Sequence, residues 1–268
     1  MKYFLLFTFF LLISTCNVVN KPTLVKDSAE LRYIDSMSHT QCYVRYKNDL
    51  YENKYRLAIA VKIHYILPGY LSINPDVLDN SKSIIDNLNI GFEDEGIHFV
   101  LEDADWYVKT YTINDFTSHY EDYQEDKLLN IIVYTNEDGA KFNGIAAGIP
   151  GNVIGILLSK NKQTVVHEVG HALGLRHTFE KDDTNGHNSN TGDQICDTPA
   201  YNIMDHNIIR CTDSIAALYT REDLDILLKN YQSYATRDKD CRENFSPYQS
   251  LAMHWYIENY PTLFLTLR

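Results

Sequence analysis

The sequence predicts an α+β fold built on a mixed sheet, and two patterns in the first half of the chain lead to this prediction. Apolar residues alternate over Leu57–Leu67 (LAIAVKIHYIL), which is the period of a strand with a buried side. Asn74-Pro75 then fits the N-cap and first position of an amphipathic helix that ends near Gly91. A strand and a helix followed by further strands favour a mixed sheet with a helix on one face.

The remaining elements follow in chain order. The alternating stretches IHFVLED, WYVKTY and LLNIIVYT predict three strands, and the β-prone run Val153–Leu158 predicts another. The acidic, tyrosine-rich segment DFTSHYEDYQEDK predicts an exposed loop or short helix. Thr220 and Ser246-Pro247 each open a predicted helix, the second ending before Pro261, and LFLTLR closes the chain as a strand or tail.

Composition narrows the class of protein. The chain has 268 residues, of which 44% are hydrophobic and 22% charged, and this balance is ordinary for a globular protein. With 24 Lys and Arg against 36 Asp and Glu, the formal net charge is -12. An acidic chain repels nucleic acid and anionic membranes, so we expect neither as a partner.

The first residues, MKYFLLFTFFLLISTC, predict an export signal over residues 1–16, because the apolar run is too short to span a bilayer. The end of this segment resembles a lipoprotein box, in which Cys16 would be lipidated and form the only membrane anchor; ordinary cleavage nearby is the alternative. Either reading places the protein outside the cytoplasm. Residues 17–54 are weakly patterned and predict a linker or pro-segment, which leaves residues 55–268 as the compact domain.

The stretch HEVGHALGLRH carries the chemistry. His167 and His171 are four residues apart and share one face of a helix that we expect Thr164 to cap, while Gly174 lets the chain turn and return His177. Three imidazoles and a water suit a catalytic zinc, and Glu168 is placed to act as a general base. The alternative is a surface helix with aligned histidines, but Gly174 and His177 in register favour the metal.

These residues match HExxHxxGxxH, the motif of the metzincin metallopeptidases, which the sequence therefore resembles. HEVGHALGLRHTF followed by GDQICDTP and NIMDH is similar to the pappalysin family, and to its ulilysin-like members, from about Leu57 to Tyr231. The resemblance implies a metzincin-like zinc-peptidase fold. Its upper subdomain would hold a twisted mixed sheet with helices, above a smaller irregular or helical lower subdomain.

The resemblance also implies roles for two residues after the motif. Met204 would form a methionine turn, an apolar floor beneath the zinc histidines, whereas a plain core methionine is the alternative. The family usually has a tyrosine two residues after this methionine, and this chain has His206 there. We hypothesise that His206 replaces it as a catalytic hydrogen-bond donor or further ligand; an exposed histidine without a role is the alternative.

Calcium and the cysteines complete the expected site residues. Relatives bind calcium near this loop, and Asp193, Asp197 and Thr198 offer suitable oxygens, although acidic loops are usually only solvated. Among the cysteines, Cys196 and Cys211 flank one loop and are the preferred disulfide; free buried thiols are the alternative. Cys42 would either hold the zinc in a latent form or form a bridge, with Cys241 as one candidate partner.

The sequence therefore predicts an exported, zinc-dependent endopeptidase that acts on peptide or protein substrates, with an oligomeric state that the sequence does not indicate. The run Val153–Leu158 would pair with an extended substrate if it is an edge strand, and would not if it is a buried central strand. Two other functions stay open: a binding or adhesion protein that keeps the zinc fold without turnover, and a zinc hydrolase of a non-peptide amide. Glu168 argues against the first.

Overall fold

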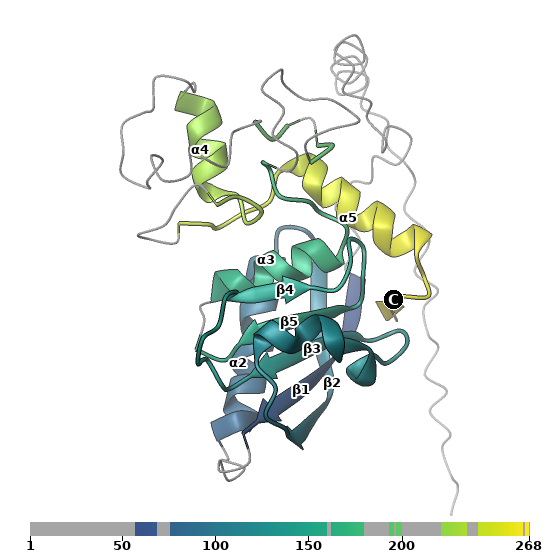
Figure 1. The fold of residues 1–268 in the computed structure, drawn as a ribbon. Helices are drawn as coiled ribbons and strands as arrows, with labels where there is room; N and C mark the ends of the chain where they lie inside the picture. Colours follow the sequence, from purple (N-terminus) through teal and green to yellow (C-terminus); the bar gives the residue numbers. More distant parts are fainter. Residues whose placement is uncertain are drawn as a thin grey trace, which may run out of the picture.

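The computed structural model describes residues 57–68, 76–159, 162–179, 193–195, 197–199, 221–234, 241–264 and 266–267. The predicted signal, linker and pro-segment lie outside these ranges and stay predictions. Within them the α+β class is confirmed, with helices on a mixed sheet (Figure 1). The strands are β1 (Leu57–Leu67), β2 (Ile97–Val108), β3 (Leu129–Tyr134), β4 (Gly144–Ala146), β5 (Val153–Leu157) and β6 (Thr266–Leu267). The helices are α2 (Asp76–Gly91), α3 (Lys162–Ala172), α4 (Arg221–Lys229) and α5 (Pro247–Asn259), with 3-10 turns η2 (Ile113–Ser118) and η3 (Tyr120–Tyr123).

The sheet has the order β2-β1-β3-β5-β4, and β6 pairs with the start of β1. Strands β1, β2, β3 and β5 run parallel to one another, whereas β4 pairs antiparallel with β5 and β6 pairs antiparallel with β1. The predicted run Leu57–Leu67 is β1, but it is buried on both faces rather than one. This difference arises because η2 and η3 cover the second face of the sheet, on which the residues between the alternating apolar positions lie.

Two apolar cores explain this burial. On one face of the sheet, residues of β1 such as Ile59 and Ile63 pack with α2, α3 and α5. On the other face, Ile66 and residues of β3 and β5 pack against η2 and η3. The acidic segment DFTSHYEDYQEDK forms these short turns, and it is not simply solvated, because Phe116, His119 and Tyr123 are buried beneath it.

Two strand predictions need correction. The stretch IHFVLED and the first three residues of WYVKTY form one continuous strand, β2, in place of two. The run Val153–Leu158 is a buried strand between β3 and β4, so the edge-strand interpretation is wrong and the strand at this edge of the described sheet is β4. The final helix begins and ends as predicted, with Ser246 as its N-cap in a capping box with Gln249. No helix in the described ranges is long and apolar enough to cross a membrane.

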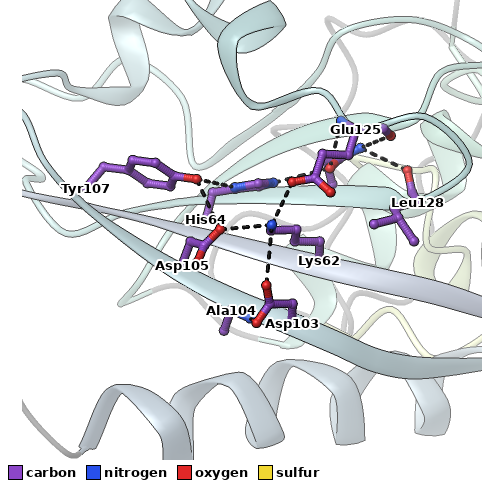
Figure 2. A network of polar contacts seen from close by, with 9 residues as sticks. Lys62, His64, Asp103, Ala104, Asp105, Tyr107, Glu125 and Leu128 are labelled. Atoms are coloured by element: carbon purple, nitrogen blue, oxygen red, sulfur yellow. Dashed lines mark hydrogen bonds and ion pairs between the residues drawn. The ribbon is translucent and has the colours of Figure 1, made fainter.

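Lys62 joins β1 to its neighbours through a cluster of charges (Figure 2). Its buried ammonium group lies 2.6 Å from Glu125, 2.9 Å from Asp105 and 3.4 Å from Asp103. Hydrogen bonds from Lys62 to Glu125 and Asp105 raise the pKa of the ammonium group, so it stays charged. The adjacent His64 is buried and donates through Nε2 to Asn130 Oδ1 at 3.2 Å, which gives it a structural role.

The Lys62 cluster predicts a pH-dependent stability. The hydrogen bond from Lys62 holds the pKa of Asp105 below its ordinary value of 3.8. Pairing with the ionised carboxylate therefore stabilises the fold above about pH 4, and this contribution is lost as the pH falls through the depressed pKa. We expect Asp105→Asn to lower the free energy of unfolding near neutral pH and to have a smaller effect at about pH 3. Denaturation of both proteins at the two pH values measures this, with Asp86→Asn on the exposed side of α2 as the control.

Candidate metal centre

Helix α3 carries the first two histidines and is embedded in the core. It already includes Lys162, so Thr164 lies within the helix and the predicted cap there is wrong. All residues from Thr164 to Ala172 are buried, because α3 packs between the sheet and the segments that follow α4 and form α5. The helix therefore presents His167 and His171 from a rigid support.

Gly174 makes the turn that returns the third histidine. Its φ of +99° lies in the region that side chains rarely adopt, and its amide donates to the His171 carbonyl at 2.9 Å. A Cβ at this position would also lie 2.0 Å from the ring of Tyr256 on α5. Glycine is therefore required here both by backbone conformation and by space, and the chain reverses to place His177 beside α3.

The three Nε2 atoms form a nearly equilateral triangle. The His167–His171 and His171–His177 separations are 3.1 Å, and the His167–His177 separation is 3.2 Å. Among the described residues, these three form the one group of at least three His, Cys, Asp or Glu side chains whose ligand atoms lie within 4.8 Å of one another. Nitrogen ligands about 2.0–2.1 Å from a tetrahedral zinc are separated by about 3.3 Å, so the triangle fits this ion.

Hydrogen bonds on the far side of the rings fix the tautomers of the first two histidines. His167 donates through Nδ1 to the Tyr231 carbonyl at 2.6 Å, and His171 donates through Nδ1 to the Leu175 carbonyl at 2.7 Å. A neutral imidazole carries one N–H, so both Nε2 atoms bear lone pairs. Two lone pairs this close repel each other unless a cation lies between them. The donor set therefore has the chemistry of a metal site.

Burial keeps the histidine rings neutral, so that a ring nitrogen of each can bind a metal ion. It lowers the pKa of His167 well below the ordinary value and the pKa of His177 to about 4, and the positive charge of Arg242 acts in the same direction. The ring of His177 stacks on Phe179 at 4.6 Å and lies 4.7 Å from the ring of Tyr234. These contacts hold the third imidazole in place on the loop that follows α3.

The segment after α4 holds α3 from the opposite side. Besides the Tyr231 carbonyl, Gln232 contacts the site twice: its Nε2 donates to the His167 carbonyl at 2.8 Å, and its own carbonyl accepts from the Thr178 amide at 3.2 Å. Asn230 fixes this segment in turn, because it exchanges two side-chain hydrogen bonds with Gln249 of α5. One short segment thus joins the metal helix, the loop of the third histidine and the last helix.

Glu168 faces an open cavity beside the histidines. The cavity has a volume of about 500 Å³ and is bordered by the segment that leads into β4, by α3 and by the segment around Tyr234. Burial raises the pKa of Glu168 to about 8, and the charge of Arg242 opposes this shift. Glu168 lies against β4: a Cβ on Gly144 would come within 2.6 Å of its Oε1. The carboxyl group is therefore positioned next to the edge of the sheet.

Most of the other predicted site residues lie outside the part of the chain that the structure describes. Met204, His206, Cys16, Cys42, Cys196 and Cys211 lie outside the described residues, so their roles stay predictions. Cys241 is disulfide-bonded, and the predicted Cys196–Cys211 bridge is not tested by this observation.

The candidate calcium ligands take part in internal hydrogen bonds. The Asp193 carboxylate accepts from the Thr198 hydroxyl and from the Ile195 amide. The Asp197 carboxylate accepts from the Ser246 hydroxyl at 2.6 Å and from the Tyr248 amide at 2.9 Å, at the N-terminus of α5. These bonds give the acids a structural role, since a carboxylate at a helix N-terminus satisfies amides that have no partner within the helix. Calcium at these residues stays a prediction.

Sequence patterns contain no signal for four residues that shape the site: Tyr231, Gln232, Tyr234 and Arg242. They contribute through a backbone carbonyl, an amide, a ring and a charge, and they lie more than 50 positions after the histidine motif. No spacing rule connects such residues to a motif this distant. Three histidine nitrogens that face one point could hold a metal ion, and a buried carboxyl group beside them is the arrangement that the metallopeptidase motif predicts.

Comparison with known proteins identifies the family. The model of the Peptidase_M43 family, described as pregnancy-associated plasma protein-A, matches residues 119–258, more than half of the chain. The chain therefore belongs to this metallopeptidase family, which confirms the predicted pappalysin family; the ulilysin-like branch stays a prediction. An extracellular metalloprotease of Verticillium alfalfae is 36% identical over 110 residues, which cover 41% of this chain and 34% of that protein. An extracellular metalloprotease of Colletotrichum graminicola is 34% identical over 98 residues, covering 37% and 31%. The matched region thus spans about a third of these relatives.

Similarity to solved structures is weak. The archaemetzincin of Methanopyrus kandleri has a TM-score of 0.37 and 10% identity, and the match covers 74% of this chain and 96% of that one. Metalloproteinase-II of Bacteroides fragilis has a TM-score of 0.29 and 18% identity, with coverage of 47% and 45%. Because both TM-scores are below 0.5, neither structure adds to the reasoning on fold or function.

Gln232 provides a test of the support beneath the metal centre. We expect Gln232→Ala to lower the free energy of unfolding by about 1–3 kcal/mol, because it leaves the buried His167 carbonyl without this donor. We also expect it to weaken zinc binding, since α3 and the His177 loop lose a shared anchor. Denaturation and competition with a chelator measure the two effects. Gln124→Ala, which removes a 2.8 Å bond to Asn152 remote from the site, is the control and should leave zinc affinity unchanged. Equal zinc affinity in all three proteins would contradict the role assigned to Gln232.

A substitution at Asp197 distinguishes a structural role of this carboxylate from calcium binding. If its carboxylate serves α5, Asp197→Ala should lower the free energy of unfolding by about 1–3 kcal/mol, and by the same amount with calcium or with a chelator present. Thermal unfolding under both conditions measures this. A calcium-dependent stabilisation that Asp197→Ala abolishes would instead establish the calcium site.

Proposed function

We propose that the chain is an exported, zinc-dependent endopeptidase with metzincin architecture, and that residues 55–268 form its catalytic domain. The observation that carries this proposal is the triangle of His167, His171 and His177 nitrogens beside Glu168, at the wall of an open cavity. Membership of the Peptidase_M43 family supports it. The apolar run over residues 1–16 and the relatives named extracellular metalloproteases support export.

In this proposal, His167, His171 and His177 hold zinc through Nε2. The bound ion supplies Lewis acidity, which lowers the pKa of water to about 7 and polarises a carbonyl group. Three protein ligands are the number found in catalytic sites, which leave one position for water or substrate, whereas structural sites use four. The fixed tautomers of His167 and His171 keep their lone pairs directed to the same point.

Glu168 acts as the general base and then as the general acid. With a cation bound to the histidines, the pKa that burial raises in Glu168 would fall, so its carboxylate would accept a proton from the attacking water and pass that proton to the leaving amine as the peptide bond breaks. Its place beside the histidines on α3 brings it within reach of this water without making it a ligand. Gly144 leaves room for the carboxyl group, because any side chain at that position would displace it.

Strand β4 is the proposed binding edge for an extended substrate. It lies at the end of the strand order with β5 on one side, and its first residue contacts Glu168. A peptide that pairs with this edge would run past the catalytic carboxyl group and the histidine nitrogens. This proposal replaces the binding edge that the sequence suggested at Val153–Leu158.

The proposal is tested by Glu168→Gln. This change keeps the size of the side chain and removes its ability to accept a proton, so we expect cleavage of a mixed peptide library to fall by at least about a hundredfold. Zinc content should be unchanged, because Glu168 is not a ligand. Mass spectrometry of the digest and metal analysis of the full chain measure the two quantities. His177→Ala, which removes a ligand, should lose both zinc and activity.

Two outcomes would contradict the proposal. A folded protein with stoichiometric zinc that cleaves no peptide would favour a binding protein or a hydrolase of non-peptide amides. Cleavage that persists unchanged in Glu168→Gln would exclude the assigned mechanism.

A further inference from the structure

Asn143 and Gly144 form an Asn-Gly pair at the point where β4 begins. Gly144 is the first residue of the strand, and Asn143 lies in the bend before it, where its side chain is exposed. Both residues border the cavity that Glu168 faces. A covalent change at this pair would therefore alter the wall of the candidate metal centre.

The fold requires the glycine of this pair but shows no such requirement for the asparagine. A Cβ on Gly144 would lie 2.6 Å from Glu168 Oε1, so a larger residue would displace the carboxyl group. The backbone carbonyl of Asn143 accepts from the Leu157 amide at 3.0 Å, but its side chain makes no hydrogen bond to any described residue. The side-chain amide group of Asn143 can therefore approach the following peptide group.

The amide nitrogen of Gly144 is not used by the neighbouring strand. Opposite residues in an antiparallel ladder alternate between pairs that exchange hydrogen bonds and pairs that do not. The bond from the Leu157 amide makes Asn143 and Leu157 a bonded pair, so the next pair, Gly144 with Ile156, is a non-bonded one. The Gly144 N–H therefore points away from β5, toward the open edge of the described sheet.

We propose that Asn143 is a site of spontaneous deamidation and that this modification inactivates the enzyme. The Gly144 nitrogen attacks Cγ of Asn143 and the new N–Cγ bond closes a succinimide ring. The Cγ–Nδ2 bond breaks, and Nδ2 leaves as ammonia with the proton from Gly144. Water then opens either carbonyl of the ring and yields aspartate or isoaspartate. Glycine favours the attack because it has no Cβ to obstruct it, and asparagine is a thermolabile residue.

Isoaspartate at position 143 would change the backbone next to Glu168. The main chain would run through Cγ, which adds one methylene group before Gly144, and the carbonyl that accepts from Leu157 would become part of a free carboxylate. Gly144 would then move relative to the Glu168 carboxyl group. We expect kcat/KM to fall by at least about tenfold in this form, because small displacements of positioned groups are costly in rate. The loss of activity rests on the proposed endopeptidase function, whereas the modification does not.

The test is an ageing experiment on the full-length, zinc-loaded protein, incubated at body temperature and at mildly alkaline or mildly acidic pH. Peptide mapping by mass spectrometry and enzymatic methylation measure aspartate and isoaspartate, and cleavage of a peptide library measures activity in the same samples. We expect Asn143 to convert several-fold faster than Asn259, which is also exposed but precedes Tyr260. Conversion should be faster at alkaline pH, because a deprotonated amide nitrogen attacks, and activity should fall in step with isoaspartate.

Two variants connect the loss of activity to this site. Asn143→Gln, whose longer side chain closes a ring far more slowly, should keep the activity with which it starts, whereas Asn259→Gln should lose activity as the unmodified protein does. The second Asn-Gly pair of the sequence, Asn185-Gly186, lies outside the described residues and is mapped separately.

Three results would overturn the inference: Asn143 that stays an amide through the incubation, full activity after Asn143 has converted, or an equal decline in Asn143→Gln. No cleavage by freshly prepared, zinc-loaded protein would instead remove the proposed function, and the peptide map would still decide whether Asn143 is modified.

Discussion

The hydrogen bond from His167 Nδ1 to the Tyr231 carbonyl is the interaction on which the site depends most. It fixes the ring and its tautomer, so the Nε2 lone pair faces His171 and His177 at 3.1 and 3.2 Å. The same segment donates from Gln232 to the His167 carbonyl and accepts from the Thr178 amide. A buried triangle of lone pairs is unfavourable without a cation, so the fold maintains a geometry that a metal ion stabilises. Two segments that are 64 residues apart in the sequence therefore meet at the His167 imidazole.

The position of the Glu168 carboxyl group follows from the sheet. The parallel strands β1, β3 and β5 are buried on both faces, and the short antiparallel strand β4 leaves an edge next to α3. Glu168 lies against Gly144 at this edge, with the cavity beside it. The rigid core thus supports α3 from one side, while the described residues between α4 and α5 contact it from the other. Tyr234 and Arg242, which border the cavity, stand on these less regular segments.

Local patterns in the sequence predicted the elements whose signals are local. The alternation over Leu57–Leu67, the capping box of Ser246 and Gln249, and the turn at Gly174 are each encoded within a few residues. Whether a strand lies at the edge of the sheet is not encoded locally. The burial of Val153–Leu157 depends on a neighbour, β4, that is only three residues long. The acidic segment before β3 likewise packs onto the core through its own Phe116 and Tyr123, which its charge pattern does not indicate. The contributions of Tyr231, Gln232 and Arg242 to the site could be found only from the tertiary structure. A contact made by a backbone carbonyl, for example, does not depend on the spacing of side chains in the sequence.

The central claim, an open site with three histidine ligands, is tested most directly by X-ray absorption at the zinc edge of the loaded full-length protein. The account predicts three nitrogen ligands at about 2.0–2.1 Å with the remaining coordination from light oxygen atoms, and loss of this signature in His177→Ala. A sulfur neighbour at about 2.3 Å, or a fourth protein nitrogen that persists when substrate analogues are added, would contradict it and indicate a closed metal site.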